Sequence, residues 1–108
     1  MGAMVVLKRG DTRTAIKATL KNPTGIAVDL TNASVKFIMA DPYGTVKINR
    51  TAEIQDAPTG MVWFVFEPPE TSVAGTYQAE FEVTFGDGRI DTYPNDDYLN
   101  VGIISDLG

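Results

Sequence analysis

Residues 77–85 read Tyr-Gln-Ala-Glu-Phe-Glu-Val-Thr-Phe, and this pattern indicates the fold class. Apolar and polar side chains alternate along it, which is typical of a β-strand with one face on a core and the other in solvent. The same period of two recurs at residues 13–20 and 35–40, while residues 61–66 are apolar on both faces. Weaker alternation predicts further strands at Val5–Lys8, Thr45–Asn49, Ala52–Asp56, Arg89–Tyr93 and Tyr98–Ile103.

Short turn signals separate these strands. Pro, Gly, Asn and Asp cluster at residues 22–25, 41–44, 57–60 and 67–70, where Pro presets φ and Gly supplies positive φ. The Gly86-Asp87-Gly88 run between two strand-like segments is the strongest hairpin signal. No amphipathic helix is evident, and only one short helical turn is expected within residues 69–74. Eight or nine short strands in about 100 residues predict a β-sandwich.

The segment around the start of residues 77–85 indicates which kind of β-sandwich to expect. Residues 70–79 look like the tyrosine corner of immunoglobulin-like domains, in which a Tyr early in one strand hydrogen-bonds back to the preceding corner. Antibody domains have a Cys two residues after this Tyr, but here the residue is Ala79 and the chain contains no Cys. We therefore predict an all-β, immunoglobulin-like sandwich of two antiparallel sheets without a disulfide. The shared alternation phase predicts this core: Ile16, Leu20, Leu30, Val35, Phe37, Val62, Phe64, Tyr77, Phe81 and Val83.

Composition limits the chemistry of the chain. Its 108 residues include no His and no Cys, which removes the usual catalytic triads, thiolate zinc sites and the commonest metal ligand. The formal net charge of −5 disfavours binding to nucleic acid or to anionic membranes. We expect no enzymatic activity, no catalytic residues, no cofactor and no metal site. We also expect residues 1–4 to be an expression scar and residues 5–108 to form one sandwich domain.

Two short patterns have both a functional and an ordinary interpretation. Asp87, Asp91, Asp96 and Asp97 could supply oxygen ligands to Ca²⁺, but their spacing does not match an EF-hand and Asp is a common turn residue. Residues 9–11 read Arg-Gly-Asp, an integrin-binding tripeptide that also occurs often by chance. We interpret both patterns as turns.

The strand at residues 61–66 carries the candidate site. If Val62, Phe64 and Phe66 point into the core, then Met61, Trp63 and Val65 point outward. An outward apolar row indicates a protein contact surface, cover by another segment of the chain, or a glycan site. Trp63 could also join Tyr43, Tyr93 and Tyr98 in an aromatic platform for sugar. We favour the protein interface, through this sheet face or through a strand edge beside it.

Several runs in a fixed order carry a family resemblance. These runs are Gly10-Asp11-Thr12 and residues 28–37, 60–66, 75–83 and 93–99. The most distinctive patterns are Asp-Leu-Thr-x-Ala-x-Val-x-Phe, within residues 28–37, and Pro-Asn-Asp-x-Tyr-Leu, within residues 93–99. From Gly10 to about Ile103, the chain resembles the N-terminal domain of phage baseplate upper proteins. The resemblance implies an immunoglobulin-like sandwich that attaches a tail appendage to the rest of the particle. Trp63 departs from the smaller or more polar residue expected there, and family proteins usually continue into helical or receptor-facing parts.

These observations together give a functional expectation. We expect a phage virion structural protein, acting as a tail or baseplate attachment or assembly module through protein–protein contacts. The alternative is a carbohydrate-binding module for a receptor on the host surface. The expected partners are other tail and baseplate proteins, with a homo-oligomer in the particle left open and no nucleic acid or membrane partner. The expected location is the virion, after synthesis in the bacterial host cytoplasm.

Overall fold

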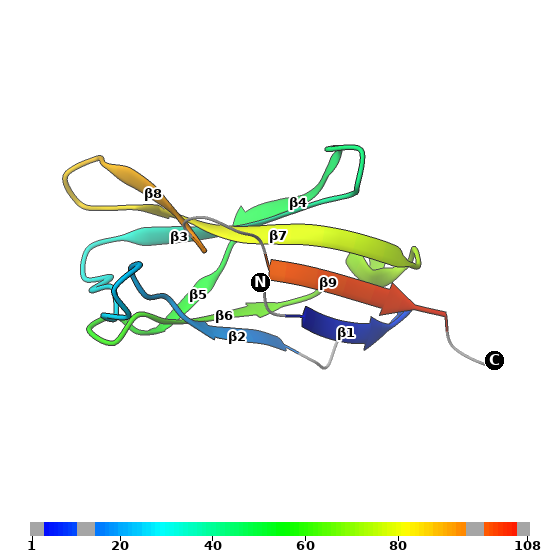
Figure 1. Ribbon diagram of the computed structural model, residues 1–108, viewed down its shortest axis with the longest axis horizontal. Coiled ribbons are helices and arrows are strands. Elements are labelled where there is room, and N and C mark those ends of the chain that lie inside the picture. Colours follow the sequence, from blue (N-terminus) through cyan, green and yellow to red (C-terminus); the bar gives the residue numbers. More distant parts are fainter. Residues whose placement is uncertain (1–3, 11–14, 95–98, 106–108) are drawn as a thin grey trace.

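The computed structural model describes residues 4–10, 15–94 and 99–105, and within them two β-sheets face each other across a core (Figure 1). In the larger sheet, hydrogen-bonded neighbours follow the order β1 (Met4–Lys8), β9 (Leu99–Ile104), β7 (Gly75–Thr84), β3 (Ser34–Ala40) and β4 (Val46–Thr51), and β8 (Ile90–Tyr93) also pairs with β7. Strand β1 runs parallel to β9, and every other strand pair in the described part of the chain is antiparallel. The predicted all-β sandwich is confirmed.

The smaller sheet has three strands, with β6 (Met61–Val65) between β2 (Ala15–Thr19) and β5 (Glu53–Asp56). The chain crosses from the larger sheet into this one between β4 and β5. Ala52 lies at the crossing, where it is buried and its N–H donates to the Val35 carbonyl at 2.9 Å. A small side chain suits this position because the two sheets come together there.

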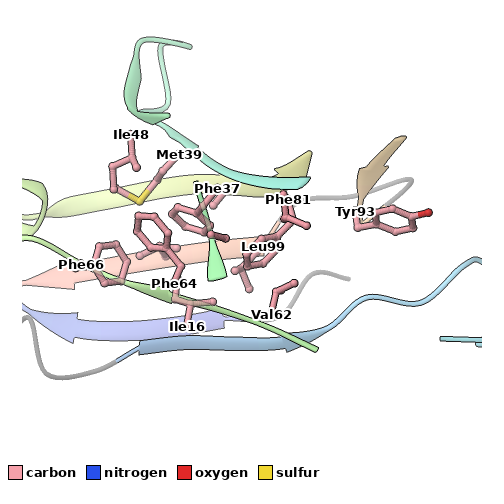
Figure 2. Packing of buried hydrophobic residues seen from close by; sticks show 14 of the residues in the cluster. Ile16, Phe37, Met39, Ile48, Val62, Phe64, Phe66, Phe81, Tyr93 and Leu99 are labelled. Atoms are coloured by element: carbon pink, nitrogen blue, oxygen red, sulfur yellow. The ribbon is translucent and has the colours of Figure 1, made fainter. Parts of the chain in front are cut away.

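All ten residues predicted for the core are buried in the structure. Phe37 of the larger sheet stacks on Phe64 of the smaller sheet, with 4.2 Å between ring centroids. Phe66 and Phe81 meet the Phe37 ring edge-on, so four aromatic rings link the two sheets (Figure 2). Offset and edge-to-face arrangements of this kind add to the free energy gained from burial alone.

The tyrosine corner is also present. The Tyr77 hydroxyl donates to the Val73 carbonyl at 2.8 Å, and Ala79 is buried where antibody domains have a Cys. The expected helical turn is a single 3₁₀ turn, η1 (Pro68–Thr71), just before this corner. No helix in the described residues is long and apolar enough to cross a membrane.

Local hydrogen bonds close the turns between strands. The Phe85 N–H donates to the Arg89 carbonyl at 2.8 Å and closes the hairpin between β7 and β8. Asp29 accepts hydrogen bonds from the backbone N–H and the hydroxyl of Thr31, an arrangement common in Asx turns. These hydrogen bonds lower the pKa of Asp29.

A candidate protein interface on the smaller sheet

The two faces of β6 have opposite environments. Val62 and Phe64 are completely buried, whereas Met61 and Val65 are 39% and 49% exposed. Trp63 lies between these two on the outer face and is half-buried. The alternation predicted from the sequence therefore gives the correct orientation for Met61, Trp63 and Val65. Their use as an interface stays a prediction.

Neighbouring strands place charged side chains on both sides of Trp63. In register with Trp63 are Lys17 on β2 and Glu53 on β5. The Lys17 ammonium lies 4.5 Å from the centroid of the Trp63 ring, a cation–π contact. Because directly opposed residues in an antiparallel pair point to the same face, Glu53 also lies on the outer face, where it is exposed.

The pairing of β2 and β5 with β6 shows which other residues lie on this outer surface. Val65 is opposite Ala15, and Met61 is opposite Thr19 on one side and Asp56 on the other, after a bulge in β5. We call this surface the small-sheet face and define it by Ala15, Lys17, Thr19, Glu53, Asp56, Met61, Trp63 and Val65. It has an apolar central row, a basic side at β2 and an acidic side at β5.

A shallow hollow on the small-sheet face lies beside the central row. Lys17, Ala18 and Thr19 form one wall, and Met61 and Trp63 form the other. The open shape and mixed lining suit contact with a protruding side chain better than enclosure of a small molecule.

Arg50 anchors the end of β6. Its Nη2 donates to the Val65 carbonyl at 2.6 Å and to Glu70 Oε1 at 2.8 Å, and its Nε donates to Glu70 Oε2 at 2.7 Å. The guanidinium also lies 4.3 Å from the centroid of the Phe64 ring. Arg50 thus ties the larger sheet to the last residue of the candidate row, which fixes the backbone under Val65.

This ion pair shifts the pKa of both partners. The hydrogen bonds to Glu70 raise the pKa of Arg50 above its usual value. Partial burial acts to raise the pKa of Glu70, but the hydrogen bonds from Arg50 and from the Glu67 N–H outweigh burial and lower it. Both groups are therefore charged at neutral pH.

The aromatic platform predicted for sugar does not form as expected. Tyr43 is 94% exposed on the turn between β3 and β4, in the other sheet, and Tyr98 lies outside the described residues. Tyr93 is buried, because its register opposite Phe81 points it into the core, so its predicted exposure was wrong. Partial burial and a hydrogen bond to Asp91 raise the pKa of its hydroxyl.

The acidic residues considered for Ca²⁺ have local partners. Asp87 accepts a hydrogen bond from the Arg89 N–H at 3.0 Å, and Asp91 accepts one from the Tyr93 hydroxyl at 3.1 Å. Asp96, Asp97 and Asp11 of the Arg-Gly-Asp run lie outside the described residues. Among the residues whose placement is described, no three acidic, His or Cys side chains form a group that could hold a metal ion.

The two packed sheets and the tyrosine corner define a disulfide-free immunoglobulin-like β-sandwich. A family model for the BppU N-terminal domain, the N-terminal domain of baseplate upper proteins, matches residues 4–93. The chain therefore belongs to this family of phage baseplate structural domains.

Solved structures share the fold at low sequence identity. The N-terminal domain of phage TP901-1 ORF48 is similar with a TM-score of 0.67 and 18% identity, over 96% of this chain and 85% of that one. CopC from Methylosinus trichosporium OB3b is similar with a TM-score of 0.56 and 15% identity, over 99% of this chain and 87% of that one. The comparison with curated proteins gives no match.

Proposed function

We propose that the chain is an assembly module of the phage baseplate that binds other virion proteins through the small-sheet face. Membership of the family supports a structural role in the phage tail. The observation that carries the proposed surface is the exposed row at the centre of the smaller sheet, where Trp63 lies between Met61 and Val65.

The physical chemistry of this row favours a protein partner. Tryptophan is enriched among residues that dominate protein interfaces, because it buries a large area at a small cost in conformational entropy. A sugar platform would need several exposed rings on one face, but Tyr43 lies on a turn of the other sheet and Tyr93 is buried. The carbohydrate alternative thus has no specific support from the geometry.

The proposed role also has implications for cofactors, other partners and location. A domain that acts by contact needs no catalytic residues, cofactor or metal. The net charge of −5 is unfavourable for a nucleic-acid or anionic-membrane partner. We place the protein in the virion tail, after synthesis in the host cytoplasm.

The test introduces a charge on the face and measures incorporation into baseplates. Trp63→Glu and Val65→Glu should leave the thermal unfolding midpoint within a few degrees of wild type and reduce incorporation at least tenfold. Tyr43→Glu is the matched control, because Tyr43 is more exposed and lies on the other sheet. Folded Trp63→Glu and Val65→Glu variants that incorporate like wild type would show that the docking surface lies elsewhere.

A further inference from the structure

We propose that the small-sheet face is self-complementary and pairs with the same face of a second copy of this chain. The inference rests on the proposed function, because it names a partner for the same surface. Its basis is the arrangement of charge on the two sides of the apolar row. Lys17 lies on the β2 side, and Glu53 and Asp56 lie on the β5 side.

Symmetry decides how two such faces can meet. Two identical faces pack through a two-fold axis that lies in the plane between them. If this axis runs along β6, the second copy is turned over so that its β5 lies against β2 of the first. Lys17 then faces Glu53 of the second copy, and Thr19 faces Asp56. The same two contacts form again on the other side of the axis.

The alternative two-fold axis, at right angles to β6, is unfavourable. It places β2 against β2, and where it passes through Trp63, Lys17 faces Lys17 and Glu53 faces Glu53. Like charges at contact distance oppose association, so charge selects the axis along β6. With that axis, the central row also stays in register, and Trp63 packs against Trp63 of the second copy.

Charge also distinguishes this face from the rest of the surface. Two copies that each carry a net charge of −5 repel one another over most orientations. On the small-sheet face, by contrast, a base and an acid are separated by the width of one strand. Within the described residues, Lys17 and Glu53 form no ion pair in their own chain, and both are exposed. Glu53 is therefore available to a second copy, and Lys17 reaches that copy by turning its ammonium from the Trp63 ring toward the facing Glu53.

The size of the face limits the area that the contact can bury. Strands of four or five residues are roughly 15 Å long, and three of them span roughly 10 Å between the outer two. A surface of this size buries less than the roughly 800 Å² per partner of a standard stable interface. We therefore expect a weak dimer, with a Kd of about 100 μM or weaker. Such a contact becomes effective where many copies are held close together in a particle.

The experiment measures self-association of the full chain by sedimentation equilibrium at protein concentrations up to about 1 mM. Wild type should form dimers, and Lys17→Glu and Glu53→Lys should each weaken dimerisation about tenfold. The double variant Lys17→Glu/Glu53→Lys should recover most of the affinity, because it exchanges the two charges and keeps them opposed. Raising the salt concentration should weaken the wild-type dimer, since exposed ion pairs are screened. Lys47→Glu, on β4 of the larger sheet, reverses a charge away from the small-sheet face and should leave dimerisation unchanged.

Three outcomes would overturn the inference. They are a wild-type chain that stays monomeric at about 1 mM, single variants that dimerise like wild type, and a double variant weaker than either single one. None of these outcomes by itself overturns the proposed function. If Trp63→Glu still blocks incorporation into baseplates, the small-sheet face binds a different virion protein and not a second copy. Each variant is checked for an unchanged unfolding midpoint, so that loss of fold is not mistaken for loss of pairing.

Discussion

Trp63 and Phe64 are adjacent in the chain, yet they have opposite roles. Phe64 is 1% exposed and stacks on Phe37 across the core, whereas Trp63 is half-buried beside Lys17 on the outer face. The difference follows from the period of two along a strand. Substitutions at neighbouring positions of β6 should therefore separate stability from binding.

Phe64→Ala should lower the free energy of unfolding by about 3–5 kcal/mol, because the ring leaves a cavity between the two sheets. Urea denaturation followed by far-ultraviolet circular dichroism measures this loss. Val65→Ala is the matched control on the same strand and should cost less than about 1 kcal/mol, since its side chain is half in solvent. Equal losses in the two variants would contradict the assigned faces of β6.

At the scale of elements, Arg50 joins three parts of the fold. It lies on β4, and its guanidinium contacts the β6 carbonyl of Val65 and the Glu70 carboxylate of η1. Glu70 Oε1 also accepts a hydrogen bond from the Glu67 N–H at 2.6 Å, so the same carboxylate caps the 3₁₀ turn. Charged hydrogen bonds thus link β4, β6 and η1.

The contribution of this link to stability should depend on pH. Because the folded structure lowers the pKa of Glu70 below its usual value of 4.5, the stabilisation is present above about pH 4.5 and is lost as the pH falls through the lower, folded pKa. Glu70→Gln should therefore be about 1 kcal/mol less stable than wild type at pH 7, a modest value because Arg50 is partly exposed. Urea denaturation of both proteins between pH 7 and pH 3 should show the difference shrinking as the pH falls.

The control for this series is Glu53→Gln. Glu53 is exposed and has no ion pair among the described residues. At protein concentrations well below those for dimerisation, Glu53→Gln should match wild type across the pH range. A constant difference between Glu70→Gln and wild type from pH 7 to pH 3 would show that charge on Glu70 does not contribute.

At the scale of the molecule, the sequence predicts more about single strands than about their partners. Alternation at residues 77–83 correctly identifies the buried side of β7, and Tyr77 correctly indicates the corner, because both signals are local. Tyr93, a candidate for the exposed aromatic platform, is instead buried, because a strand of four residues gives too little alternation to show which side faces the core. Its direction is fixed only by pairing with Phe81.

In the candidate site, too, the sequence predicts the orientation of side chains on one strand but not their neighbours on other strands. Met61, Trp63 and Val65 could be assigned to one face from their own strand. The Lys17 ammonium over Trp63 and the Glu53 carboxylate on its other side depend on the register of β2, β6 and β5, for which the sequence has no signal. No sequence motif predicts the contacts of Arg50 either, because Val65 and Glu70 are brought to it by the packing of the two sheets.

The parallel register of β1 and β9 has a mechanical consequence. Met4 pairs with Asn100 and Lys8 with Ile104, so the entry of the first strand and the exit of the last strand lie at opposite ends of one pair. Tension applied between these two points loads the strand pair in shear, and all of its backbone hydrogen bonds share the force at once. An antiparallel pair pulled in the same way would peel apart one bond at a time. The domain should therefore resist stretching by its ends until β1 slides off β9 as a unit.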